Sequence, residues 1–170
     1  CLLSRGLGDV YKRQVVEYGI SALKAVFHRG AVDADGKTGD GAGIHLEIPS
    51  DFFSEKIEIT GHKHDGSEIC VGMIFLPRNN YEAQENARTL IESELTKSNF
   101  SIYGWRQVPV NPKVLGEKAN LTRPEIAQVL FKHNDKNLTG KTLERKLYES
   151  RRKIENKAIK NQLEGFYLSL

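Results

Sequence analysis

The chain has few of the residues that mark several common classes of protein. Its 170 residues include two cysteines, one methionine and one tryptophan. Two cysteines as far apart as Cys1 and Cys70 form neither a disulfide framework nor a zinc-binding spacing. Cys70 lies in an apolar run, as is typical of a small core residue. This cysteine usage predicts a protein of a reducing compartment, which we take to be the cytoplasm.

Long apolar runs and a strong charge imbalance are also missing. No run approaches the roughly 18 apolar residues of a membrane span, so we expect no membrane partner. The net charge of +3 is too small to indicate a nucleic-acid partner. The composition, 39% hydrophobic and 28% charged, is that of a soluble globular protein, and the length suits one domain with a modest core.

Hydrophobic periodicity predicts the order helix, strand, strand, helix, strand, strand, helix, strand. The expected ranges are 15–27, 44–48, 69–76, 83–95, 100–108, 126–131, 141–164 and 166–170. The first helix should bury one face, and Asn79 or Asn80 should cap the second. The strand at 69–76 should be central in a sheet, whereas 166–170 reads as a strand without a partner in this sequence. Consecutive strands mixed with helices indicate an α+β fold.

The most informative segment is a glycine-rich loop at residues 28–44, which contains five glycines and three aspartates. Such a loop adopts backbone angles that other residues avoid and lets main-chain atoms come close to a neighbour. Gly36-Lys37-Thr38 does not fit a phosphate-binding loop, because position 31, where the loop needs a glycine, is alanine. The three aspartates do not fall at EF-hand offsets, and no glutamate closes the loop.

Three other polar features carry weaker signals. His62 and His64 lie in a polar turn without a third ligand nearby, so we expect no metal site. The run 103–106, Tyr-Gly-Trp-Arg, either lines a pocket for a polar ligand or packs in the core with an ion-paired Arg106. The long basic helix at 141–164 carries an apolar stripe, which favours core packing with a solvated charged face over nucleic-acid binding.

The glycine loop and the segments around it resemble one family. His28-Arg29-Gly30-Ala31 followed by Thr38-Gly39-Asp40-Gly41-Ala42-Gly43-Ile44 is similar to the start of the type-2 glutamine amidotransferase domain of the glutamate synthase large subunit. Further matching segments are Ala22-Leu23-Lys24, Phe75-Leu76-Pro77-Arg78, Tyr103-Gly104-Trp105-Arg106-Gln107-Val108-Pro109-Val110, Gly116-Glu117-Lys118-Ala119, Arg123-Pro124-Glu125-Ile126 and Arg151-Arg152-Lys153-Ile154-Glu155. The resemblance covers about Val15 to Leu170.

The resemblance implies a fold and a chemistry. The fold would be an N-terminal-nucleophile hydrolase, a four-layer αββα sandwich of which this chain holds an incomplete part. An N-terminal cysteine would attack the side-chain amide of L-glutamine, with its own α-amino group as base, and give a thioester, glutamate and ammonia. The ammonia would pass to 2-oxoglutarate, and reduction would give a second glutamate. FMN and an iron–sulfur cluster would belong to the remainder of the chain, with a small electron-donating subunit as a further partner, and we expect no cofactor and no metal in this region.

The same resemblance points to individual site residues. Cys1 is a candidate nucleophile, although its surroundings differ from those of the family's cysteine. Arg29, Gly30, Asp40 and Gly41 would support the active site, Arg29 by bracing the cysteine loop and Asp40 by hydrogen bonds to backbone N–H groups. The alternative for Arg29 is a capping role on carbonyls at the end of the preceding helix.

The chain departs from the family pattern near both ends. The family opens with Cys-Gly-Ile/Val-Gly-Phe, whereas residues 1–14 here match translated adapter sequence better, with a divergent nucleophile strand as the alternative. We therefore divide the chain into a non-native stretch at 1–14 and the front part of the amidotransferase domain at 15–170. The family's glutamine-binding and oxyanion-stabilising motifs are not among these residues. We interpret the chain as a piece of a longer protein and expect it to be inactive alone.

Two alternatives remain open from the sequence. The first is another class-II amidotransferase, of the asparagine synthetase or phosphoribosyl amidotransferase type, although the long glycine loop argues against it. The second is a non-catalytic member that keeps the fold and binds a partner. The choice between NADPH, NADH and ferredoxin as electron donor lies outside this region.

Overall fold

The computed structural model describes residues 2–26, 30–39, 41, 43, 45 and 47–170. The chain divides into two compact units, which are described separately. The first unit comprises Cys1–Glu47 with Asn111–Thr122, and the second comprises Ile48–Val110 with Arg123–Leu170.

The first unit contains helix α1 (Leu2–Ala25), the 3₁₀ turn η2 (Pro112–Val114) and helix α4 (Glu117–Thr122). The helix predicted for 15–27 is present as the second half of α1. The first half of α1 lies before the expected boundary between residues 14 and 15, and the helix crosses that boundary without a break. The prediction that α1 buries one face is wrong for its described side chains. Val16, Gly19 and Leu23, which recur at helical spacing, are only half-buried, and Ile20 is exposed. An apolar stripe is buried only against another apolar surface, and all the buried hydrophobic side chains of the described residues lie in the second unit.

The second unit is built on a four-stranded antiparallel sheet. Its strands are β1 (Cys70–Leu76), β2 (Phe100–Gln107), β3 (Glu125–His133) and β4 (Tyr167–Ser169), in the spatial order β2-β3-β1-β4. The strand predicted at 69–76 is confirmed, and it lies inside the sheet as expected. The expectation that the last strand has no partner is wrong, because Leu168 of β4 pairs with Ile74 of β1.

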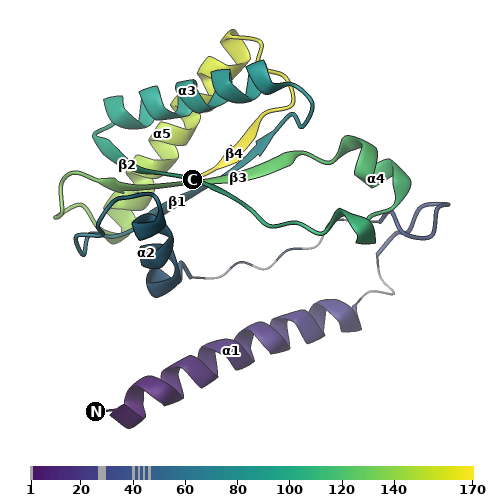
Figure 1. Ribbon diagram of the computed structural model, residues 1–170, viewed down its shortest axis with the longest axis horizontal. Helices are drawn as coiled ribbons and strands as arrows, with labels where there is room; N and C mark the ends of the chain where they lie inside the picture. Colours follow the sequence, from purple (N-terminus) through teal and green to yellow (C-terminus); the bar gives the residue numbers. More distant parts are fainter. Residues whose placement is uncertain (1, 27–29, 40, 42, 44, 46) are drawn as a thin grey trace. The chain divides into compact units, whose positions relative to one another are not determined.

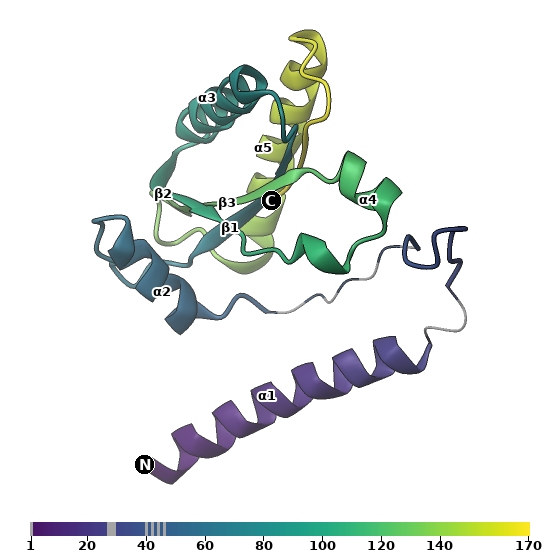
Figure 2. The same ribbon diagram turned by 45° about the vertical axis from the view of Figure 1, so that its right-hand side comes forward.

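Two long helices, α3 (Tyr81–Lys97) and α5 (Gly140–Lys160), lie side by side over one face of the sheet (Figures 1 and 2). Ala87, Ile91 and Leu95 recur every four residues on α3 and are fully buried, as the apolar face of a helix on a sheet should be. Asn80 caps α3, since its side-chain oxygen accepts a hydrogen bond from the Ala83 amide. Both helices and this cap agree with the sequence prediction.

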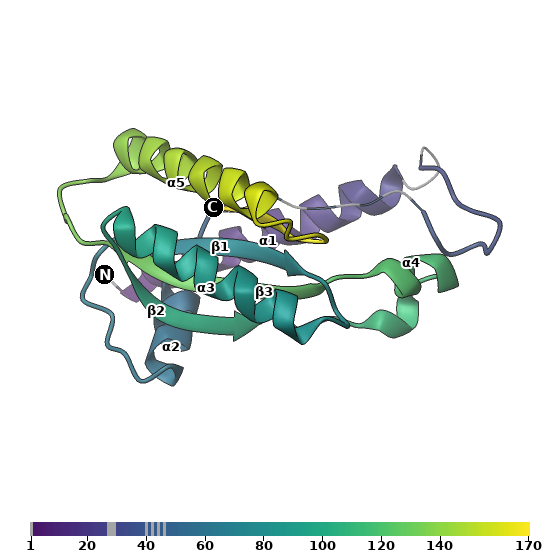
Figure 3. The ribbon, with the colours of Figure 1, turned by 90° about the horizontal axis from the view of Figure 1, so that it is seen from above.

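The opposite face of the sheet carries the short helix α2 (Ser50–Ile59): Figure 1 shows the sheet between α2 and the two long helices, and in Figure 3, seen from above, β2 passes in front of α2. Phe53 and Ile57 of α2 pack with Ile69, Tyr103 and Leu130 in a small apolar cluster. The sequence analysis missed this helix. It also predicted a strand at 44–48. Ile44 and Leu46 lie outside the described residues, and His45, Glu47 and Ile48 are not in a strand.

The main core lies between the sheet and the helices α3 and α5. Its fully buried members come from all four strands and both helices: Ile74, Leu76, Ile91, Leu95, Phe100, Val129, Phe131, Ile154 and Leu168. The rings of Phe100 and Phe131 meet edge to face with centroids 5.2 Å apart, a favourable aromatic geometry. These elements confirm an α+β class with a small antiparallel sheet. In the described residues, no helix combines the length and the apolar character needed to cross a membrane.

Candidate functional site

The described part of the glycine loop forms a tight hairpin in the first unit. The Asp33 amide donates to the Thr38 carbonyl over 2.7 Å, and the Gly36 amide donates to the Asp33 carbonyl over 2.9 Å. Val32 and Gly39 face each other across an isolated antiparallel bridge. Gly36 has φ +67°, a left-handed conformation that glycine adopts without steric cost. The glycine at this position therefore closes the turn.

The side chain of Asp35 holds this hairpin from inside. Its carboxylate accepts hydrogen bonds from the amides of Lys37 and Thr38, over 2.9 and 2.7 Å, and from the Thr38 hydroxyl over 2.5 Å. These hydrogen bonds lower the pKa of Asp35 to about 2, and the bond from the Thr38 hydroxyl has the largest effect. A hydrogen bond from the Glu117 amide contributes to the same shift. Hydrogen bonds to the charged form favour ionisation, so Asp35 is a carboxylate at neutral pH.

A second segment of the first unit, residues 116–118, contacts the hairpin. A Cβ on Gly116 would lie 2.1 Å from the Thr38 hydroxyl oxygen and 2.3 Å from a carboxylate oxygen of Asp35. The Lys118 ammonium lies 2.7 Å from a carboxylate oxygen of Asp33. This bond is the first cause of the lowered pKa of Asp33. The structure thus brings together two segments that the family resemblance contains at separate places in the sequence.

The residues predicted to support catalysis are only partly described. Cys1, Arg29 and Asp40 lie outside the described residues. Gly30 and Gly41 are exposed, and a Cβ on Gly41 would have no described neighbour within 4 Å. The close approach is at Gly39 instead, where a Cβ would lie 2.9 Å from the Ala31 carbonyl oxygen.

Cys70, the other cysteine, is unsuited to nucleophilic chemistry. Its side chain is buried in β1, and burial raises the pKa of the thiol to about 12, with smaller contributions from Glu68 and Glu144. Because the thiolate is the reactive form, Cys70 is inert at neutral pH. Its predicted role as a core residue is confirmed.

His62 and His64 take part in side-chain hydrogen bonding at the end of α2. The Ser67 carbonyl accepts a hydrogen bond from Nε2 of His64 over 2.8 Å, and Nδ1 lies 3.1 Å from the Ser54 hydroxyl. His62 lies 3.2 Å from the Thr60 hydroxyl. Within the part of the chain that the structure describes, no group of three His, Cys, Asp or Glu side chains could hold a metal ion.

Asp65 is the centre of a charged cluster beside His64. The ammonium groups of Lys132 and Lys136 lie 2.7 and 3.1 Å from its carboxylate, and the Tyr103 hydroxyl donates to it over 3.4 Å. The Lys132 ammonium, followed by Ser67 and then Lys136, holds the pKa of Asp65 far below its usual range. Burial, with the Asp65 charge as a second cause, raises the pKa of Tyr103 to about 12. The cluster fixes the 60–67 turn against β2 and β3.

We expect this cluster to make the second unit less stable as the pH decreases. Because the folded pKa of Asp65 lies below its unfolded value near 3.8, its stabilisation is present above about pH 4 and is lost as the pH falls further. Asp65→Asn should lower the urea midpoint at pH 7 and flatten its decline between pH 5 and 3. Trp105 fluorescence reports the transition, and Glu164→Gln, at an exposed position, is the control. An unchanged pH slope in Asp65→Asn would contradict the assignment.

The run 103–106 does not line one common pocket. Tyr103 is buried in the cluster under α2, whereas Trp105 packs against the core on the α3 side and donates to Glu92 over 2.6 Å. Arg106 donates to the Gln128 side chain over 2.6 Å and lies over the Phe52 ring. Core packing is therefore the correct alternative, but the hydrogen-bond partner of Arg106 in the described part of the chain is an amide and not a carboxylate.

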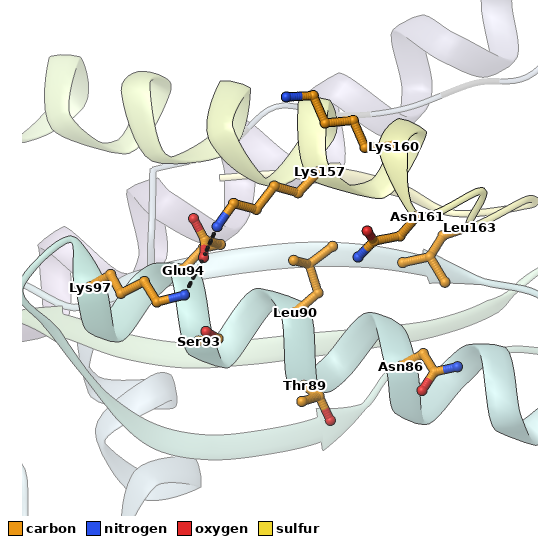
Figure 4. Close-up of a pocket in the computed structure, with 10 residues that line it drawn as sticks. All are labelled: Asn86, Thr89, Leu90, Ser93, Glu94, Lys97, Lys157, Lys160, Asn161 and Leu163. Atoms are coloured by element: carbon orange, nitrogen blue, oxygen red, sulfur yellow. Dashed lines mark hydrogen bonds and ion pairs between the residues drawn. The ribbon is translucent and has the colours of Figure 1, made fainter.

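A polar groove runs between α3 and α5, with a volume of about 620 Å³ (Figure 4). Glu94, which is nearly buried, accepts from Lys97 and Lys157 over 2.9 and 2.7 Å. The hydrogen bond from Lys157 is the main cause of a lowered pKa of Glu94, and burial of the carboxylate acts in the opposite direction. Figure 4 shows that these three side chains meet at one end of the groove. They join the two helices. The predicted packing role of the apolar stripe on the basic helix is confirmed separately, because Leu143, Leu147 and Ile154 of α5 are buried.

Comparison with known proteins places the sequence of this chain in a family. The profile of the glutamine amidotransferases class-II matches residues 5–170. The chain is 50% identical over 157 residues to the glutamate synthase [NADPH] large chain of Azospirillum brasilense, which covers 92% of this chain and 10% of that protein. It is 36% identical over 150 residues to a ferredoxin-dependent glutamate synthase of Pyropia yezoensis, covering 88% of this chain and 9% of the relative.

A third relative, the ferredoxin-dependent glutamate synthase 2 of Synechocystis, is 36% identical over 155 residues, which is 91% of this chain and 10% of that protein. The chain thus spans about a tenth of the length of these relatives. The family profile covers nearly the whole chain, including the glycine hairpin and the Gly116–Lys118 segment that contacts it. The chain belongs to the class-II glutamine amidotransferases, a family of N-terminal-nucleophile enzymes.

Proposed function

We propose that the chain is the front part of the glutaminase domain of a glutamate synthase, which releases ammonia from L-glutamine. The observation that carries this proposal is that nearly the whole chain matches glutamate synthases of two kinds, one named for NADPH and one named for ferredoxin. The long Thr-Gly-Asp-Gly-Ala-Gly form of the loop at 38–43 favours this family over other class-II amidotransferases, and the hairpin that precedes it is held by contacts with Gly116–Lys118.

The proposed reaction uses an N-terminal cysteine. Its thiol transfers a proton to the free α-amino group, and the sulfur attacks the side-chain carbonyl carbon of glutamine. The C–N bond breaks as the amide nitrogen takes up a proton, which gives ammonia and a γ-glutamyl thioester. Water then cleaves the thioester and gives glutamate and the free thiol. Cys1, or a cysteine that precedes Val15 in the native gene, would supply this group, because Cys70 is buried with a raised pKa.

We place the other site residues by the family resemblance. Arg29 and Asp40 would order the backbone around the nucleophile, and Gly30 and Gly41 would leave space for the main chain to approach it. In the complete enzyme, ammonia would pass to 2-oxoglutarate in a later part of the chain. FMN and an iron–sulfur cluster would bind there, a small subunit could deliver electrons, and the enzyme would work in the cytoplasm.

We also propose that a second sheet packs on the face of the sheet that carries α2. Ile126, Phe75 and Tyr167 lie in one row across β3, β1 and β4, and Met73 lies one row further along the same face of β1. These side chains are half-buried or exposed, although they are large and apolar. A second sheet would cover them and complete the four-layer αββα sandwich.

The proposed function is tested with two chimeras of the Azospirillum brasilense large chain. In the first, residues 15–170 of this chain replace the matched region behind the relative's own N-terminal residues. In the second, residues 1–170 are used from Cys1 onward. We expect the first chimera to release glutamate from glutamine, and the second chimera and the 170-residue chain alone to be inactive, because no family-like nucleophile strand follows Cys1.

Glutamate formation from added ammonia and 2-oxoglutarate is the control, because it bypasses glutamine hydrolysis. A first chimera that uses ammonia but not glutamine would overturn the proposed function. Glutamine hydrolysis by the second chimera that Cys1→Ala abolishes would instead show that Cys1 is the native nucleophile and that residues 1–14 belong to the domain.

A further inference from the structure

The groove between α3 and α5 has the length of a short peptide. Asn86 and Lys97, the lining residues at its two ends on α3 (Figure 4), are about three helical turns apart, which is about 16 Å. An extended segment of about five residues covers this distance. A small inorganic anion, in contrast, would contact only one end of the groove.

Positive charge dominates the lining of the groove. Lys97, Lys157 and Lys160 contribute three positive charges and Glu94 one negative charge, a net charge of +2. Lys97 and Lys157 both donate to the same oxygen of Glu94, Oε1. Each ammonium has three N–H groups, and the two side chains are 63% and 45% exposed, so further donors are accessible. This excess of positive donors complements an acidic partner.

The rest of the lining suits a peptide better than a simple anion. It combines amides, hydroxyls and leucines: Asn86, Asn161, Thr89, Ser93, Leu90 and Leu163. Amide and hydroxyl side chains both donate and accept hydrogen bonds, as pairing with peptide N–H and C=O groups requires. Figure 4 shows Leu90 between the lysine end and the end with Asn161 and Leu163. An apolar centre with polar surroundings is typical of protein interfaces.

We infer that the groove between α3 and α5 binds an acidic peptide segment from the remainder of the glutamate synthase large chain. This inference rests on the function proposed above, since the chain spans about a tenth of the length of its relatives. A segment of the same polypeptide is present at high effective concentration. Contacts as weak as exposed ion pairs are therefore sufficient to hold it, and they fix the second unit on the rest of the large chain.

The test is carbodiimide cross-linking of the first chimera, purified with its small subunit, followed by mass spectrometry. Carbodiimide couples a lysine amine to a carboxylate only where the two are in direct contact. We expect Lys97, Lys157 or Lys160 to be joined to an Asp or Glu of one segment outside residues 15–170. The yield should fall at about 0.5 M salt, which screens exposed charges. Lys141 and Lys153, which are exposed on α5 and do not line the groove, should not be joined to that segment.

A double variant, Lys97→Gln with Lys160→Gln, lowers the charge of the groove by two. It keeps the bond between Lys157 and Glu94, so α3 and α5 stay joined and Lys157 remains as the reporter. We expect the yield of the link from Lys157 to the acidic segment to fall about 3- to 10-fold. The matched control is Lys141→Gln with Lys153→Gln, which removes the same charge elsewhere on α5 and should leave the yield unchanged.

Links from the groove lysines only to residues within 15–170 or to the small subunit would overturn the inference. An equal loss of yield in the two double variants would do the same. In both cases a parent chimera that hydrolyses glutamine leaves the proposed function intact. A parent chimera that uses ammonia but not glutamine would overturn the proposed function, whatever links form.

Discussion

Replacing Ile154 with alanine is expected to lower the free energy of unfolding of the second unit by about 2–5 kcal/mol. Ile154 lies on α5, is 0% exposed, and belongs to the core cluster between the helices and the sheet. Truncation removes three buried carbon atoms and leaves a cavity that helix and sheet backbones cannot easily close. Loss of contacts across this interface should also loosen α5 from the sheet.

Ile159→Ala provides a matched control on the same helix. Ile159 is 76% exposed, so the same truncation should change stability by no more than about 0.5 kcal/mol. Urea unfolding is followed by the fluorescence of Trp105, the single tryptophan, which packs against this core. Equal shifts of the urea midpoint in the two variants would show that α5 does not pack on the sheet through Ile154.

Elements with a long, regular apolar repeat could be predicted from the sequence. β1 is a continuous apolar run, and α3 and α5 repeat their buried residues at helical spacing, so local pattern and final environment agree. Helix α2 was missed because it is short, with only Phe53 and Ile57 buried, and because Pro49 at its N-cap makes no side-chain capping bond. Two buried positions are too few to define a period.

Contacts between distant segments could not be predicted in the same way. The partner of β4 is β1, and no local feature of residues 166–170 indicates which strand they join. Likewise, the glycines of the loop were evident, but the contact of Asp35 and Thr38 with Gly116 depends on how the chain returns. The signal that could have indicated this contact is the segment Gly116-Glu117-Lys118. The family resemblance includes it, but the sequence analysis assigned it no function.

A second large effect is expected from Gly104→Ala, which should lower the free energy of unfolding by about 2–4 kcal/mol. The register between β2 and β3 shifts between Ile102 and Gly104, so the strand is bulged there. Gly104 has φ +152°, and a Cβ on it would lie 2.9 Å from the Thr60 methyl carbon. The alanine therefore adds both backbone strain and a steric clash at a site where the chain is already irregular.

The two contributions can be separated with Thr60→Ser, which removes the methyl group and keeps the hydroxyl that donates to the Tyr103 carbonyl over 2.9 Å. In the Gly104→Ala background, Thr60→Ser should recover about 1 kcal/mol or more, whereas alone it should cost little; this is a coupling in the range expected for residues in contact. Urea midpoints of the four proteins give the coupling energy. Without recovery, the loss would come from backbone strain alone. A neutral Gly104→Ala would show that the bulge, which turns Tyr103 toward α2 and Asp65, does not require glycine.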